Sequence, residues 1–164
     1  MALVAVGVSG GISAYKAVEV VRQLQKAGHQ VAVVMTRAAT RFVGPVTFEA
    51  ITQRRVITSQ WTPGANADIE HIALASEAAL LLVAPATANT IARLAHGLSN
   101  DFLTSLALAT RAPVLVAPAM NTHMYDHPAT QANMALLRSR DGRTCGCSSP
   151  APRGPAHAWP APAT

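Results

Sequence analysis

A turn rich in glycine and serine is the first feature of this sequence that favours chemistry. Gly7–Gly11 ends the apolar run Leu3–Val8 and precedes a helical pattern. Glycines permit a tight turn that exposes backbone N–H groups, and the N-terminus of the following helix attracts anions. Ser9 adds a hydroxyl, so the turn suits a phosphate. It lacks the spacing of the dinucleotide fingerprint and of a P-loop, and packing alone also explains such a turn.

Two further turns follow apolar runs and carry polar side chains. Pro85–Thr90 offers hydroxyls, an amide and another helix N-terminus, although simple N-capping by Thr87 is the alternative. Pro118–Met124 places Asn121 where it can bind a carboxylate or an amide. The methionines of this turn suit contact with a flat ring, and they also suit the core.

His71 is the candidate general base, because an imidazole titrates near neutral pH. It follows Asp68 and Glu70 just before a helical stretch, whereas a structural or exposed histidine is the alternative. We expect no metal site, since no metal motif is present and the thiols of Cys145 and Cys147 alone cannot complete a zinc site.

The elements that must position these residues alternate between strand and helix. The apolar runs predict buried strands, and the intervening stretches show helical periodicity. The predicted strands are Leu3–Val8, Val31–Met35, Val56–Thr58, Leu80–Ala84 and Val114–Ala117. The predicted helices are Ile12–Ala27, Ala38–Val43, Pro45–Thr52, a stretch from Asp68 through Ala79, Thr87–Gly97, Asp101–Thr110, a single turn at Met120–Met124, and Pro128–Arg140.

This alternation predicts an α/β fold with a doubly wound, mostly parallel sheet and helices on both faces, of the Rossmann or flavodoxin-like kind, in a single domain. Ligands of such folds bind beyond the carboxyl ends of the strands. We therefore expect the turns at Ser9, Thr87 and Asn121 to converge at one edge of the sheet.

Composition limits the partners of the chain. Its 164 residues carry a net charge of +5, but the basic residues are scattered, which disfavours nucleic acid. A solvated surface explains this charge, and a phosphate-bearing ligand would also suit it. The stretch Ala78–Ala86 is too short to span a bilayer, and the N-terminus lacks the features of a signal peptide. We expect a cytoplasmic protein without membrane contacts.

The last part of the chain differs in kind from the rest. No Ile, Leu, Val, Met or Phe follows Leu137, and five of the 11 prolines lie between Pro150 and Pro162. We predict a folded domain over residues 1–140 and an irregular or disordered tail over 141–164 that supplies neither strand nor amphipathic helix to the core.

Several stretches in the same order resemble one family, the homo-oligomeric flavin-containing cysteine decarboxylases, and in particular their phosphopantothenoylcysteine decarboxylases. The matching stretches are Gly7–Lys16, Val33–Ala39, Ala67–Ala75, Ala84–Ile91, Ala117–Met124 and Pro128–Asn133. Motifs in the right order are far more specific than any one alone.

This resemblance implies the cofactor, the reaction and the roles of the residues. FMN would be held by Ser9, Gly10, Gly11, Thr36, Thr87, Ala88, Asn89, Thr90 and the backbone of Ala119. His71 would be the base, and Asn121 would bind the substrate carboxylate. The flavin would oxidise the cysteine moiety of 4′-phosphopantothenoylcysteine to a thioaldehyde, which then loses carbon dioxide, a step of coenzyme A biosynthesis. The protein would form a trimer or a dodecamer, with FMN at a subunit interface.

The chain departs from this family after Leu137, which keeps other functions open. The family's Ala-Cys-Gly flap motif has only a faint echo at Cys145–Gly146. The protein would then stop at the enethiol, as peptidyl-cysteine decarboxylases do, or act as a flavin-binding regulatory subunit without turnover. Flavin prenyltransferases are a weaker alternative, because they lack the stretch that Pro118–Asn121 provides here.

Overall fold

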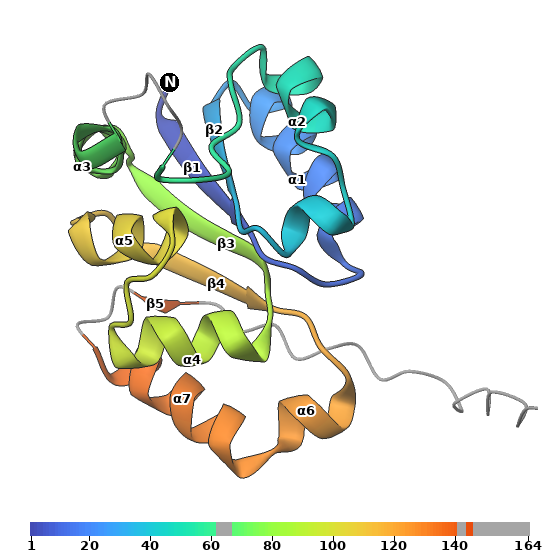
Figure 1. Ribbon diagram of the computed structural model, residues 1–164, viewed down its shortest axis with the longest axis vertical. Helices are drawn as coiled ribbons and strands as arrows, with labels where there is room; N and C mark the ends of the chain where they lie inside the picture. Colours follow the sequence, from blue (N-terminus) through green and yellow to red (C-terminus); the bar gives the residue numbers. More distant parts are fainter. Residues whose placement is uncertain (62–66, 141–143, 146–164) are drawn as a thin grey trace, which may run out of the picture.

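A parallel sheet forms the centre of the molecule, in a computed structural model that describes residues 1–61, 67–140 and 144–145 (Figure 1). The strand order is β2-β1-β3-β4-β5, and all neighbouring pairs are parallel. The strands are β1 (Leu3–Val8), β2 (Gln30–Met35), β3 (Leu80–Ala86), β4 (Val114–Pro118) and β5 (Thr144–Cys145). This order, 2-1-3-4-5, is that of flavodoxin-like folds, so the predicted fold class is confirmed.

Helices cover both faces of the sheet. On one face α1 (Ala14–Lys26) and α2 (Pro45–Thr52) pack on β1 and β2, with a short 3₁₀ turn, η1 (Ala39–Arg41), between β2 and α2. The other face carries α3 (Ala67–Glu77), α4 (Ala88–His96), α5 (Phe102–Ala109) and α7 (Pro128–Ser139). A single short helix, α6 (Thr122–Asp126), joins β4 to α7.

The strands are apolar along their whole length because both faces are covered. Alternate residues of β1 enter different cores: Val4, Val6 and Val8 pack towards α1, whereas Ala5 packs towards α3, α4 and α5. This is the pattern expected of a parallel sheet buried between helices.

Local signals set several helix ends. Gly28 and Gly97, with φ angles of +85° and +66°, follow α1 and α4 in the left-handed conformation that glycine adopts most readily. The N-terminus of α5 has a capping box, in which Asp101 accepts from the Thr104 N–H and the Thr104 hydroxyl oxygen accepts from the Asp101 N–H. Predicted helix ends at these positions agree with the structure to within two residues.

The structure corrects two predictions. Val56–Thr58 is not a strand, because only Ile57 forms an isolated bridge, to Val34. The segment after residue 140 does supply a strand, since Thr144–Cys145 pairs with β4. Backbone pairing needs no aliphatic side chain, and composition alone therefore missed it.

The irregular character predicted for residues 141–143 and 146–164 falls outside the described residues. Within the described residues, no helix combines the length and apolar character needed to cross a membrane.

Strand order fixes where a ligand site belongs. The chain leaves β1 for β2 on one side and then crosses to β3 on the other side of β1. Connections therefore diverge at the carboxyl ends of β1 and β3, and this divergence leaves a crevice between the two loops.

Candidate functional site

The β1–α1 turn presents a row of free backbone donors at this crevice. Within the described part of the chain, the N–H groups from Gly10 to Ser13 have no hydrogen-bond acceptor. They lie at the N-terminus of α1, a helix of 13 residues, where the helix dipole adds partial positive charge. Unpaired N–H groups at a helix N-terminus bind anions, phosphate above all.

Gly10 brings the loop after β2 against this turn. A Cβ atom on Gly10 would lie 2.4 Å from the Ala38 Cβ and 2.8 Å from the Ala38 carbonyl carbon, so no larger residue fits without displacement of the backbone. Thr36 begins the same loop: its N–H donates to Val8 O over 3.0 Å, and its Oγ1 accepts from the Ala39 N–H over 3.2 Å. Thr36 therefore lies beside the turn.

Ser9 joins the β1–α1 turn to the β3–α4 turn. Its N–H and its hydroxyl both donate to Pro85 O, over 3.2 and 2.7 Å, and its Oγ accepts from the Thr87 N–H over 3.0 Å. Ser9 is 1% exposed. The predicted convergence of these two turns is confirmed by direct hydrogen bonds.

The β3–α4 turn aims a second helix N-terminus at the same edge. Thr87 is the N-cap of α4, and its Oγ1 accepts from the Thr90 N–H over 3.3 Å. The hydroxyl of Thr90 lies 3.1 Å from that of Thr87 and is 5% exposed, so of the two it is the less accessible. Among the described residues, the N–H groups of Ala88 and Asn89 find no acceptor.

The third turn lies beside the second. The Ala119 N–H donates to Ala86 O over 2.9 Å, which places the β4–α6 loop against the start of the β3–α4 turn. Asn121 is the N-cap of α6, and its Oδ1 accepts from the His123 N–H over 2.9 Å. This bond fixes the orientation of the exposed amide, so its NH₂ group remains available as a donor to a carboxylate.

His71 lies in the middle of α3, next to a different helix. Its ring packs edge-on against Phe102 at the start of α5, with ring centroids 6.1 Å apart and an interplanar angle of 88°. Phe102 is 3% exposed and belongs to the core, so it gives the partly exposed imidazole a rigid wall.

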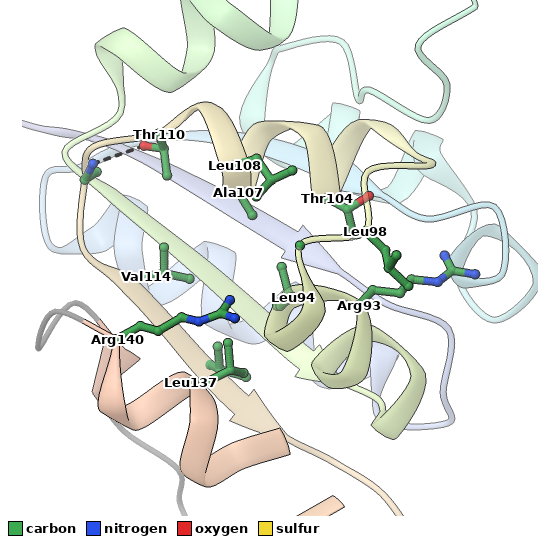
Figure 2. A pocket seen from close by; sticks show the side chains of 13 residues that line it. Arg93, Leu94, Leu98, Thr104, Ala107, Leu108, Thr110, Val114, Leu137 and Arg140 are labelled. Carbon is green, nitrogen blue, oxygen red and sulfur yellow. Dashed lines mark hydrogen bonds between the residues drawn. The ribbon is translucent and has the colours of Figure 1, made fainter. Parts of the chain in front are cut away.

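A separate cavity of about 180 Å³ lies between α4, α5, α7 and β4 (Figure 2). Its lining includes the ends of α4 and α7 and the start of β4, so it belongs to the opposite end of the sheet from the turns. Most of its polar side chains already have partners: Thr110 accepts from the Ala112 N–H, and Arg93 pairs with Asp101 at 3.1 Å. It is therefore not the predicted site.

Sequence reasoning missed the partners that hold the site. The Pro85 carbonyl that binds Ser9, the Ala38 backbone that touches Gly10 and the Phe102 ring beside His71 carry no motif of their own. Only Gly10 gave a signal, because a glycine next to a turn often marks a close approach of two backbones.

Comparisons with known proteins agree with this geometry. Residues 2–154 match the family model described as Flavoprotein. The curated relatives include the coenzyme A biosynthesis bifunctional protein CoaBC of Vibrio vulnificus (strain YJ016), 52% identical over 134 residues, and that of Bacillus subtilis (strain 168), 49% identical over 130 residues. These alignments cover 82% and 79% of this chain but 33% and 32% of the relatives, so the chain spans about a third of their length.

Solved structures give the same result over most of their length. The FMN-dependent cysteine decarboxylase SpaF is 35% identical, with a TM-score of 0.80, and the match covers 88% of this chain and 83% of SpaF. A mutant PPC decarboxylase in complex with pantothenoylaminoethenethiol is 28% identical, with a TM-score of 0.70, and the match covers 83% of this chain and 76% of that one.

Proposed function

This chain belongs to the flavoprotein family, and from this we propose that it binds FMN and decarboxylates the cysteine moiety of 4′-phosphopantothenoylcysteine in coenzyme A biosynthesis. The observation that carries the proposal is the junction of the β1–α1 and β3–α4 turns, where the N–H groups from Gly10 to Ser13 find no acceptor in the part of the chain that the structure describes. The names of the CoaBC relatives and of the PPC decarboxylase neighbour support the substrate.

The residues at this junction fit the phosphate end of FMN. An anion at the N-terminus of α1 satisfies donors that otherwise have no protein acceptor within the described residues. The close approach of Gly10 to Ala38 packs the loop after β2 against this turn, and the Thr36 hydroxyl in that loop offers another donor. In flavodoxin-like sheets, FMN binds at this same switch point between the first and third strands.

The substrate half of the site belongs to Asn121 and His71. A bound FMN would supply a hydride acceptor for Cβ of the cysteine moiety, and this oxidation would provide the electron sink that loss of the carboxylate needs. The NH₂ group of Asn121 donates to that carboxylate and orients it. The imidazole of His71, held against Phe102, accepts the proton that the thiol releases.

The proposal includes a cytoplasmic homo-oligomer, a trimer or a dodecamer, with the active site at a subunit interface. Several exposed apolar side chains lie on the elements around the site. They include Ile12 (76% exposed) in the β1–α1 turn, Phe42 (50%) and Val46 (69%) near η1 and α2, and Ile72 (53%) beside His71. Burial of such side chains between copies of the chain favours association.

A second candidate is a peptidyl-cysteine decarboxylase that stops at the enethiol. The sequence after Leu137 favours it, because the Ala-Cys-Gly flap motif has only a faint echo at Cys145–Gly146. The oxidative half of the reaction is common to both candidates, so they differ in substrate and in final product.

The test begins with the absorption spectrum of the purified protein and the mass of the cofactor released from it. We expect a yellow protein that releases FMN. Incubation with 4′-phosphopantothenoylcysteine, followed by mass spectrometry, should show loss of carbon dioxide. Turnover of a peptide with a C-terminal cysteine, but not of the phosphorylated conjugate, would favour the second candidate. A colourless protein that ignores added FMN contradicts both.

Replacement of the base gives a sharper prediction. His71→Asn should lower the decarboxylation rate about 100-fold or more, because general base catalysis contributes that much. FMN binding should persist, since His71 contacts Phe102 on α5 and lies outside the turns at Ser9 and Thr87. Single-turnover flavin reduction measures the first effect and flavin fluorescence the second. Unchanged flavin reduction in this variant would remove His71 from the mechanism.

A further inference from the structure

We propose that Ser9 is a positioning residue that locks two turns together, and that it leaves the phosphate of the flavin to the backbone N–H groups of Gly10–Ser13. This inference rests on the proposed function and changes the role that the resemblance assigned to Ser9.

The Ser9 hydroxyl has one proton to donate, and that proton is already used. Oγ lies 2.7 Å from Pro85 O, a short and buried contact. A lone pair of the same oxygen accepts from the Thr87 N–H over 3.0 Å. A phosphate oxygen needs a donor, so Ser9 would bind it only by breaking its bond to Pro85 O. With Ser9 only 1% exposed, the side chain also offers almost no surface to a ligand.

The hydroxyl instead determines how two turns meet. The Thr87 N–H lies at the N-cap of α4 and finds its acceptor 78 positions away, at Ser9 Oγ. The Ser9 N–H adds a further bond to Pro85 O over 3.2 Å. Loss of the hydroxyl leaves the Thr87 N–H without its acceptor, and a partly buried donor in that state is costly. The β1–α1 turn and the N-terminus of α4 would then move apart.

The donors left for the phosphate are the backbone groups that no described residue satisfies. These are the N–H groups from Gly10 to Ser13, which directly follow Ser9 in the chain. Ser9 directly precedes these residues and is itself anchored to Pro85 O. It therefore orients their N–H groups without contacting the ligand. Ser9 therefore positions both turns that form the proposed flavin site, the β1–α1 turn and the β3–α4 turn.

The experiment compares Ser9→Ala with Ser139→Ala in the full chain. Ser139 also donates its hydroxyl to a backbone carbonyl, Leu136 O over 2.9 Å, but it is exposed at the end of α7. Three quantities are measured: the melting temperature without flavin, the exchange rate of the Thr87 amide without flavin, and the affinities for FMN and riboflavin at a temperature where every variant is folded. Riboflavin lacks the phosphate and so reports on the rest of the site.

We expect Ser9→Ala to lower the melting temperature of the flavin-free protein by about 3–8 °C. The Thr87 amide should exchange about tenfold faster or more. Affinities for FMN and riboflavin should both fall, about tenfold, because both turns move. Ser139→Ala should leave all of these quantities close to those of the original protein.

Two results would overturn the inference. If Ser9→Ala weakens FMN alone, with riboflavin affinity and the flavin-free melting temperature unchanged, then Ser9 is a direct phosphate ligand. If it lowers only the melting temperature, with both affinities unchanged, then Ser9 is structural and does not position the site. Failure of the proposed function looks different, because the original protein would then bind neither flavin.

Discussion

The junction between the β1–α1 and β3–α4 turns is buried and tied by hydrogen bonds, whereas the β4–α6 loop is exposed. Ser9 is 1% exposed and bonds to both Pro85 and Thr87. The side chain of Asn121, in contrast, makes one local bond, to the His123 N–H in the first turn of α6, and the residue lies open to solvent. The two regions lie side by side, because Ala119 bonds to Ala86.

This difference indicates that the two regions have separate roles. A buried junction with fixed donors is preformed and holds a ligand at little cost in ordering. An exposed loop with a single oriented amide can admit and release another molecule. We therefore assign cofactor binding to the buried junction and substrate binding to the exposed loop.

The largest effect is expected from Gly10→Ala. Its Cβ would lie 2.4 Å from the Ala38 Cβ and 2.8 Å from the Ala38 carbonyl carbon, so the two backbones must separate. We expect FMN affinity to fall about 100-fold or more, together with a loss of about 1–3 kcal/mol in the free energy of unfolding. Flavin fluorescence titration and denaturant unfolding measure these quantities.

Gly11→Ala is the matched control for this substitution. A Cβ on Gly11 meets only the Thr87 Cγ2, at 3.5 Å, which is an ordinary van der Waals distance. Its effects on FMN affinity and on stability should be clearly smaller than those of Gly10→Ala. Equal effects of the two variants would show that the approach of Gly10 to Ala38 does not shape the junction.

The exposed loop predicts the opposite pattern for Asn121→Asp. Aspartate still caps α6, because its carboxylate accepts from the His123 N–H, but it loses the NH₂ donor and repels the substrate carboxylate. We expect kcat/KM to fall about 100-fold, with FMN affinity and melting temperature nearly unchanged. Steady-state kinetics and thermal unfolding test this. A large loss of FMN affinity in this variant would show that the exposed loop also binds the cofactor.

The smallest effect on FMN affinity is expected at Asp101, which belongs to neither region. This residue caps α5 through the Thr104 N–H, over 2.9 Å, and pairs with Arg93 at 3.1 Å. Asp101→Ala should cost about 0.5–2 kcal/mol of stability and leave FMN affinity unchanged, since it acts at the opposite end of α4 from Thr87.

Asp101→Asn separates the two contributions of this side chain. The amide oxygen still caps α5, and only the charge attraction to Arg93, in a partly solvent-screened pair, is lost, so the cost should stay below about 1 kcal/mol. Denaturant unfolding of both variants measures the two free energies of unfolding and so separates the cap from the ion pair. Weakened FMN binding in either variant would mean that the site is coupled to the far end of α4.

Much of the fold followed from local patterns. The apolar runs predicted β1 at its observed bounds and β3 and β4 to within two residues, because burial on both faces leaves a continuous apolar signal. The isolated bridge at Ile57 and the strand Thr144–Cys145 were predicted wrongly. Both depend on which backbone lies beside them, and side-chain patterns carry little of that information.

Local patterns in the sequence were enough to predict most of the helices and strands, the parallel arrangement that brings their turns to one edge, and the residue types at those turns. Only the tertiary structure decided what those residues do there. It used the Ser9 hydroxyl for a bond to Pro85 O, 76 positions away, and it left the N–H groups from Gly10 to Ser13 without an acceptor among the described residues. The physical reason is range: periodicity and capping act between near neighbours, whereas a hydrogen bond across two turns exists only after the sheet has assembled.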